Sequence, residues 1–259
     1  HPLSRPTPRS LVLGLLATPR PVPASLRAYA TLATEGRSRY FCLVDSLVGL
    51  ALLEEALASA GAEPQKVLLE LGVDGGRAGC RDRASALALA ERIGASTEVR
   101  LAGLEAFEGA VPEKGLRGTL AAVDSLLARL GELAFELDER GAFSDDDEIV
   151  LSAGGSAYFD RVIETLSVLR LSRPVRVVLR SGCYVTHDCG LYSRSSPLGG
   201  RGVDQGRLRT ALELWPCVLS RPEPGLSILG FGKRDCPPHI HRPIPPPAPR
   251  PPPPPRPPP

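Results

Sequence analysis

The chain has 259 residues, of which 42% are hydrophobic and 23% charged, an ordinary composition for a protein with a buried core. Its 31 basic and 29 acidic residues leave a formal net charge of +2, which gives no electrostatic case for nucleic acid or an anionic membrane as a partner. No apolar run approaches the roughly 20 residues of a membrane span. The six cysteines form no CxxC pair and the start follows no signal-peptide pattern, so we expect a cytoplasmic protein with reduced thiols.

Both ends of the chain have a composition that does not suit a packed domain. Residues 1–10 are rich in proline, arginine and serine without periodicity, and we expect a disordered leader. Residues 236–259 are dominated by proline, which predicts a tail that is disordered or forms polyproline II helix. Residues 251–256 satisfy the PxxPxR pattern of polyproline-domain ligands, although proline- and arginine-rich tracts often do so by chance.

Between these ends, short apolar segments alternate with amphipathic ones. Strands are expected at residues 11–16, 39–44, 66–71, 99–105, 148–153 and 176–180, and helices at 24–34, 48–60, 83–93, 116–140 and 160–166. This alternation of Val- and Leu-rich strands with helices predicts an α/β domain over residues 11–215, built on a parallel sheet. After residue 200 the pattern changes: 208–215 is expected to be helical, and 217–222 and 226–230 to be strands of a second β region, residues 216–235.

Glycines and polar residues collect where the expected strands end, which is where parallel α/β folds place their sites. Gly154, Gly155 and Ser156 stand between a strand and a helix. Glycines let the backbone approach a ligand, and free N–H groups at a helix start favour phosphate. The alternative interpretation is an ordinary turn in which Ser156 caps the helix.

Three other groups of residues have ligand or catalytic chemistry. Arg77 lies among glycines, where it could hold a phenolate, carboxylate or phosphate, or simply be a surface arginine. His187 and Asp188 could form a polarised base, but neighbours on a strand point to opposite faces, which favours two unrelated side chains. A metal site is not expected in the proline-rich tail, where Cys236, His239 and His241 lack a second ligand pair.

Taken in order, the strand ends resemble the D-threonine aldolase / D-serine dehydratase family of pyridoxal 5′-phosphate (PLP) enzymes, with bacterial amino-acid deaminases looking closest. The residues that carry the resemblance are 41–46, 69–72 with 75–80, 101–105 with 108–109, 151–156, 180–184 and 232–235. The resemblance covers about residues 11–235. It implies an incomplete fold-type III, alanine-racemase-like (β/α)8 barrel of about six strand–helix units, with PLP at its carboxyl rim and the start of a smaller β domain behind it.

The resemblance also implies roles for single residues. By motif position, Gly154, Gly155 and Ser156 would hold the cofactor phosphate, with Gly182 and Tyr184 nearby, and Arg77 would approach the phenolic side of the ring. The implied chemistry is β-elimination or retro-aldol cleavage of D-amino acids and 3-hydroxy amino acids, with PLP as the electron sink.

Two features of the family have no match in this sequence. Family members bind PLP covalently through a lysine in a Pro-His-x-Lys-Thr-like motif, and they carry a His/Cys metal pair in the β domain. We therefore predict no catalytic lysine and no metal site. Binding of PLP would be non-covalent at best, and the chain, a fragment on this interpretation, would be inactive or very slow.

Two alternatives remain open at this stage. The chain could be a non-catalytic interaction protein that presents its polyproline tail on the remnant of a barrel, or a reading frame without a folded product. If two barrel strands are missing, the exposed sheet edges predict association between molecules.

Overall fold

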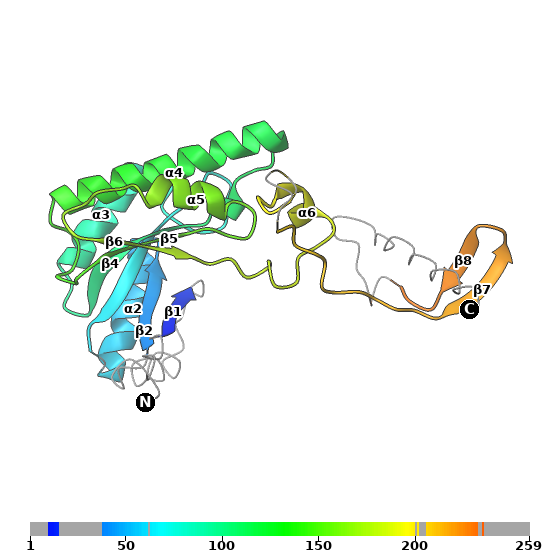
Figure 1. Ribbon diagram of the computed structural model, residues 1–259. Helices are drawn as coiled ribbons and strands as arrows, with labels where there is room; N and C mark the ends of the chain where they lie inside the picture. The colour runs from blue at the N-terminus through cyan, green and yellow to red at the C-terminus, as the bar shows by residue number, and fades with distance from the viewer. Residues whose placement is uncertain are drawn as a thin grey trace, which may run out of the picture.

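The computed structural model describes residues 10–15, 38–61, 63–199, 201, 206–232 and 235. Its body is a six-stranded sheet in which every neighbouring pair is parallel and the strands follow chain order. The strands are β1 (Ser10–Leu15), β2 (Ser38–Val44), β3 (Gln65–Leu71), β4 (Val99–Ala106), β5 (Ile149–Ala153) and β6 (Val175–Leu179). The helices between them are α2 (Leu47–Ala60), α3 (Arg83–Gly94), α4 (Gly115–Glu139) and α5 (Phe159–Leu166) (Figure 1). The predicted alternation of parallel strands with helices is confirmed.

The ends of α2 and α3 are determined by their own sequences. The Ser46 hydroxyl accepts a hydrogen bond from the Gly49 N–H (3.1 Å), and Gly61 ends α2 with a left-handed φ of 58°. The Asp82 carboxylate accepts one from the Ser85 N–H (2.8 Å) at the start of α3. Side-chain caps and a left-handed glycine are the standard signals for helix ends, so these bounds follow from local chemistry.

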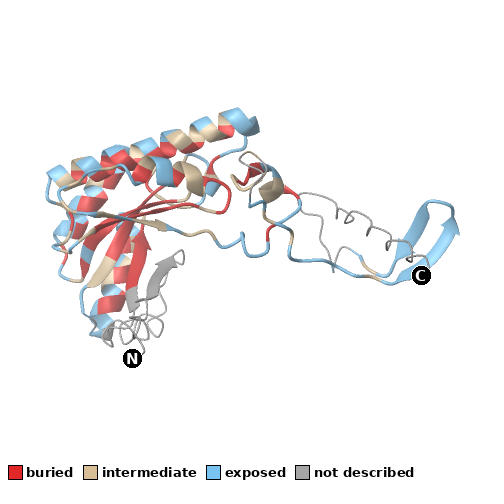
Figure 2. Ribbon diagram, in the orientation of Figure 1, coloured by how far each residue is buried: buried red, intermediate tan, exposed pale blue. Residues whose placement is uncertain are grey.

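The helices cover one face of the sheet. The larger apolar core joins side chains of β2, β3, β4 and β5 to side chains of all four helices. The opposite face carries a small cluster without a helical residue: Phe41, Leu43, Leu68, Ala102 and Val150, with Val178 packed against it. Figure 2 shows the buried residues concentrated in the sheet and on the helix sides that face it. A one-sided cover is typical of a barrel segment, since a doubly wound sheet carries helices on both faces.

The segment after the body differs in part from the prediction. Residues 207–217 form no helix, so the expected helix at 208–215 is wrong. Leu212, Leu214 and Trp215 (83%) are exposed in the described part of the chain, whereas most amphipathic helices are stabilised by packing an apolar face. The two expected strands do form, as an antiparallel hairpin of β7 (Val218–Glu223) and β8 (Leu226–Leu229) that projects away from the body (Figure 1).

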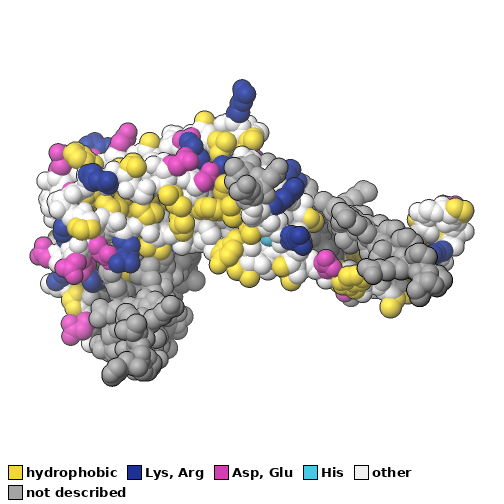
Figure 3. Space-filling view, viewed as in Figure 1, with side chains coloured by type: hydrophobic (Ala, Val, Ile, Leu, Met, Phe, Trp, Pro, Cys, Tyr) yellow, Lys and Arg dark blue, Asp and Glu magenta, His cyan; other side chains and the backbone are white. Residues whose placement is uncertain are grey.

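Several expectations fall on residues outside the described part of the chain. These are the leader at 1–9, the helix at 24–34 and the proline-rich tail at 236–259, which stay predictions. Among the described residues, no helix combines the length and the apolarity needed to cross a bilayer. On the face drawn in Figure 3, basic and acidic side chains are interspersed over the body.

Arg201 ties the short helix α6 (Leu191–Ser195) to the loop that follows β5. Its guanidinium forms an ion pair with Asp160 and donates to the carbonyl oxygens of Ala157 (2.7 Å) and Ser195 (2.6 Å). It also lies 5.4 Å from the centre of the Tyr158 ring. Arg201 thereby links the loop between β5 and α5, which carries the predicted phosphate site, to α6.

Candidate cofactor site

A layer of polar side chains crosses the sheet near the carboxyl ends of the strands. Glu70 of β3 is in register with Glu105 of β4, Glu105 with Ser152 of β5, and Ser152 with Val178 of β6. Residues in register on neighbouring strands point to the same face of a sheet. Val178 packs on the helix-free face, so these side chains share the face that would be the inside of a barrel.

Glu105 is the most perturbed carboxyl group of this layer. It is 1% exposed, and burial raises its pKa to about 8; the positive charge of Arg180 lowers the pKa, while Glu70 and Glu108 raise it further. Arg180 forms an ion pair with Glu105 and donates to the Ala106 carbonyl oxygen (2.9 Å). The Oε2 atom of Glu105 and the Nε atom of Arg180 have no hydrogen-bond partner among the described residues. Such unpaired buried polar atoms are uncommon and concentrate at functional sites.

Phe107 lies beneath two guanidinium groups. Arg77, from the loop between β3 and α3, has its Cζ atom 5.2 Å from the centre of the Phe107 ring, and that of Arg180 lies at 5.9 Å. Arg77 and Phe107 also line a small cavity together with Glu70. The structure therefore brings Arg77, an exposed residue, to the edge of the polar layer, where its charge lowers the pKa values of Glu70 and Glu105 against the larger effect of burial.

The predicted phosphate turn, residues 154–156, binds a carboxylate of the chain itself. The Gly154 N–H donates to Glu108 Oε2 (3.0 Å) and the Gly155 N–H donates to Glu108 Oε1 (2.5 Å). Glu108 comes from the 3-10 helix η1 (Glu108–Ala110), which follows β4. Gly154 has a φ of +95°, and a Cβ atom there would lie 2.5 Å from the Leu179 side chain, so only glycine fits. The 154–156 turn presents two adjacent N–H groups to one oxyanion.

The loop after β6 adjoins this turn. The Ser156 hydroxyl accepts a hydrogen bond from the Tyr184 N–H (3.1 Å), and the Ser181 hydroxyl donates to the Gly154 carbonyl oxygen (2.9 Å). Ser156 and Tyr184 are thus in direct contact, and Gly182 lies between two residues that touch the turn. Helix α5 begins later, at Phe159, with Tyr158 as its N-cap and no capping side chain. The alternative interpretation of Ser156 as a helix cap is wrong, because its hydroxyl is used across the loops.

Three residues at this rim had no role assigned from the sequence: Phe107, Glu108 and Arg180. Glu108 lies 46 residues from Gly154 along the chain, so its contact with the turn leaves no local pattern. The one available signal was the placement of two acidic residues, Glu105 and Glu108, at the end of an apolar strand. Charged groups in such a position are seldom buried without a partner.

The remaining candidates from the sequence are the His187–Asp188 pair and the ligand types of the proline-rich tail. His187 is buried and has a φ of 44°. Asp188 accepts hydrogen bonds from the N–H groups of Gly190 (3.0 Å) and Tyr192 (2.8 Å). Both residues lie in a loop, not on the strand considered for them from the sequence. Asp188 shapes the loop that leads into α6. Cys236, His239 and His241 lie outside the described residues, within which no group of three potential ligands is arranged for a metal.

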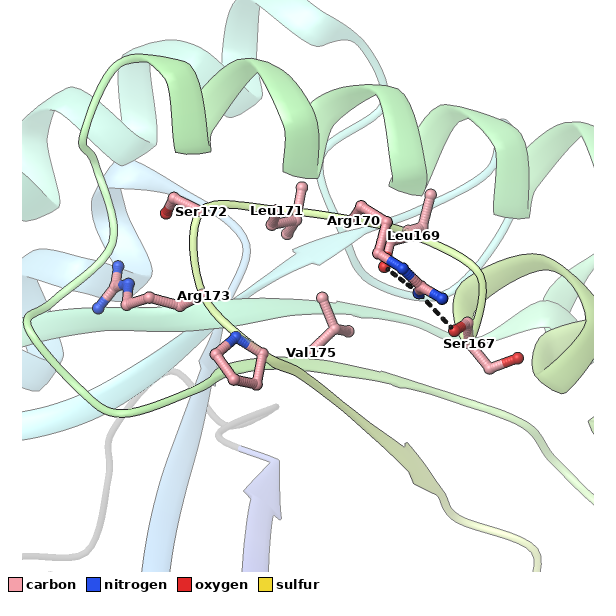
Figure 4. A pocket seen from close by; sticks show the side chains of 8 residues that line it. Ser167, Leu169, Arg170, Leu171, Ser172, Arg173 and Val175 are labelled. Atoms are coloured by element: carbon pink, nitrogen blue, oxygen red, sulfur yellow. Dashed lines mark hydrogen bonds between the residues drawn. The ribbon is translucent and has the colours of Figure 1, made fainter.

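A larger hollow than the one beside Phe107 lies elsewhere in the body. It measures about 430 Å³ and is lined by Ser167, Leu169, Arg170, Leu171, Ser172, Arg173, Pro174 and Val175, which form one continuous segment (Figure 4). This segment leads into the amino-terminal end of β6, opposite to the strand ends described above. In Figure 4 the Arg170 guanidinium turns back onto carbonyl oxygens of its own loop. The hollow therefore brings together no chemistry from separate elements.

Sequence comparisons find two curated relatives. The chain is 25% identical over 212 residues to 3-hydroxy-D-aspartate aldolase of Paracoccus denitrificans (strain Pd 1222), covering 81% of this chain and 51% of that protein. It is 29% identical over 191 residues to D-threonine aldolase of an Arthrobacter species, covering 73% of this chain and 45% of that protein. The chain thus spans about half the length of these relatives. No protein-family model matches the chain.

A solved structure has the same fold. The crystal structure of D-threonine aldolase from Filomicrobium marinum superposes with a TM-score of 0.63 at 23% identity, covering 90% of this chain and 58% of the other. The sequence matches and the shared fold agree with the resemblance drawn from the strand ends. This chain is therefore similar in sequence to these two aldolases, and the resemblance drawn from its strand ends is confirmed.

Proposed function

We propose that this chain binds PLP at the carboxyl ends of β4, β5 and β6, as part of a lyase that acts on 3-hydroxy D-amino acids. The body would be about six units of an alanine-racemase-like barrel, which the one-sided cover of helices supports. The two relatives are named for the cleavage of D-threonine and 3-hydroxy-D-aspartate. Their names suggest the substrate class, a D-amino acid with a hydroxyl group on its β-carbon.

One observation carries the proposal: the adjacent N–H groups of Gly154 and Gly155 bind both oxygens of a carboxylate. A pair of N–H groups that binds one oxyanion has the donor chemistry that a phosphate needs. The residues present therefore fit the cofactor phosphate. Gly154, Gly155 and Ser156 would hold it, with Gly182 and Tyr184 alongside.

The ring of the cofactor would have partners on the other side of the turn. Arg77 supplies a permanent positive charge for its phenolic oxygen, and Phe107 supplies an apolar face beside it. PLP, when bound, supplies an electron sink for bond cleavage at the α-carbon of an amino acid. Glu105, whose pKa burial raises to about 8, is the carboxyl group of this layer that can take up or release a proton.

Binding is proposed to be non-covalent in this chain. Its lysines are Lys66, Lys114 and Lys233. Lys66 pairs with Asp146 at the amino-terminal end of β3, away from the rim, and Lys114 is exposed before α4. Lys233 lies outside the described residues. We therefore expect cofactor binding without efficient turnover.

Replacing Ser156 by aspartate tests the assignment. A carboxylate beside the turn would repel the cofactor phosphate, so we expect PLP affinity to fall at least about tenfold, the equivalent of about 1.4 kcal/mol. Absorbance titration with PLP measures the change. Ser167→Asp, the same substitution at an exposed serine after α5, is the control and should bind as the unchanged chain does. Equal affinity in Ser156→Asp and the unchanged chain, with matching circular dichroism spectra, would rule out this phosphate site.

A further inference from the structure

Glu108 is a buried carboxylate whose partners are backbone donors. Its side chain is 0% exposed, and both of its oxygens accept hydrogen bonds from the 154–156 turn. Among the described residues, no lysine or arginine forms an ion pair with it. Burying a carboxylate without a cation is costly unless strong hydrogen bonds replace its water. The two N–H groups therefore act as the anion-binding partner of Glu108.

The same two N–H groups cannot serve two anions at once. Each carries a single hydrogen, and a charge-assisted hydrogen bond to a carboxylate uses it fully. The space beside the turn is also taken, because a Cβ atom on Gly155 would lie 3.2 Å from Glu108 Oε1 and 3.5 Å from the Phe107 ring. A phosphate group that enters the turn must displace the carboxylate, and would be repelled by it if it stayed nearby.

We propose that Glu108 is an internal competitor for the 154–156 turn, so that a phosphate group binds only when the Glu108 carboxylate leaves. This inference rests on the proposed function, since it concerns the same turn, and it adds a residue that sets the affinity of the site for phosphate. Glu108 stands on a single turn of 3-10 helix, and its side chain can leave without moving a sheet strand.

The test is titration of the chain with inorganic phosphate by calorimetry. Glu108→Gln removes the charge and replaces one accepting oxygen by a donor, and Glu108→Ala empties the turn. We expect both variants to bind phosphate at least about tenfold more tightly than the unchanged chain, the equivalent of about 1.4 kcal/mol. The inference is overturned if neither variant binds phosphate more tightly.

A matched control distinguishes two causes of tighter phosphate binding: an emptied 154–156 turn and the loss of one negative charge nearby. Glu113 is an exposed carboxylate five residues further along the chain. The pKa of Tyr158 is raised mainly by burial, and the charges of Glu113 and Glu108 both raise it further, so both carboxylates act on the same part of the rim. Glu113→Gln removes the same charge from the same rim without opening the turn. It should bind phosphate as the unchanged chain does. A gain equal to that of Glu108→Gln would overturn the competition and leave only a general charge effect.

A measurement on the unchanged chain tests the inference even if the Glu108 variants do not fold. In amide NMR spectra, saturating phosphate should shift the Gly154 and Gly155 resonances, because their hydrogen-bond acceptor changes. Unmoved resonances would overturn the inference.

Titration of the Glu108 variants with PLP distinguishes the two proposals: tighter phosphate binding without PLP binding supports the competition and contradicts the proposed cofactor. Equal PLP affinity in all variants supports the cofactor and contradicts the competition.

Discussion

Replacing Gly103 by alanine is expected to prevent stable folding of the body. Gly103 of β4 pairs with Val150 of β5, and a Cβ atom on Gly103 would lie 1.8 Å from the Val150 carbonyl oxygen and 2.7 Å from its carbon. Both are backbone atoms in the interior of the sheet, so they can move only if the two strands separate. We expect the free energy of unfolding to fall by about 4 kcal/mol or more, a large part of the 5–15 kcal/mol typical of a domain. Urea denaturation followed by circular dichroism measures the loss.

Gly94→Ala is the control for this substitution. Gly94 is the last residue of α3, and a Cβ atom there would meet no atom within 4 Å. Alanine is a better helix former than glycine by about 1 kcal/mol, so the variant should be as stable as the unchanged chain or slightly more stable. If Gly103→Ala and Gly94→Ala unfold at the same urea concentration, the close approach of β4 and β5 at Gly103 is refuted.

Glu105→Gln is expected to change how stability depends on pH. The pKa of Glu105 is raised from its ordinary value of 4.5 to about 8, mainly by burial, so the folded chain holds this proton more tightly than the unfolded chain. The resulting stability is fully present below about pH 4.5 and is lost as pH rises toward about 8. Between pH 6 and pH 9 the unchanged chain should therefore lose about 2.7 kcal/mol relative to Glu105→Gln, since stability falls by about 1.4 kcal/mol per pH unit up to the folded pKa. Urea midpoints at the two pH values give the difference.

A second buried carboxyl group, Glu70, contributes to the same pH dependence. Burial also raises the pKa of Glu70, with the same sign, so part of the pH dependence should persist in Glu105→Gln. Glu136→Gln is the control, because hydrogen bonding to Arg83 lowers the pKa of Glu136 and its titration lies well below pH 6. Glu136→Gln should run parallel to the unchanged chain from pH 6 to pH 9. A parallel course for Glu105→Gln as well would refute the raised pKa.

Local patterns predicted the body of the fold well. Each of the six strands and the four helices that lie in described residues forms within one or two residues of its expected place. Their signals are local, because the apolar period, Ser46 at a helix start and Gly61 at a helix end act within a few residues of each other. The expected helix at 208–215 does not form, because a helix of this kind depends on contacts beyond its own sequence. Its amphipathic pattern requires an apolar surface to pack on, and the described residues leave Leu212, Leu214 and Trp215 exposed.

The sequence by itself determined the alternation of strands and helices, the family resemblance and the glycines of the 154–156 turn. Gly154 needs a conformation that other residues avoid, and such a requirement is visible in the residue type alone. Only the tertiary structure decided what binds those glycines. The carboxylate of Glu108 reaches the turn across 46 residues, and Arg180 reaches Glu105 across the sheet, because parallel strands place their carboxyl ends side by side. Contacts of that kind depend on strand order and register, which no short stretch of sequence encodes.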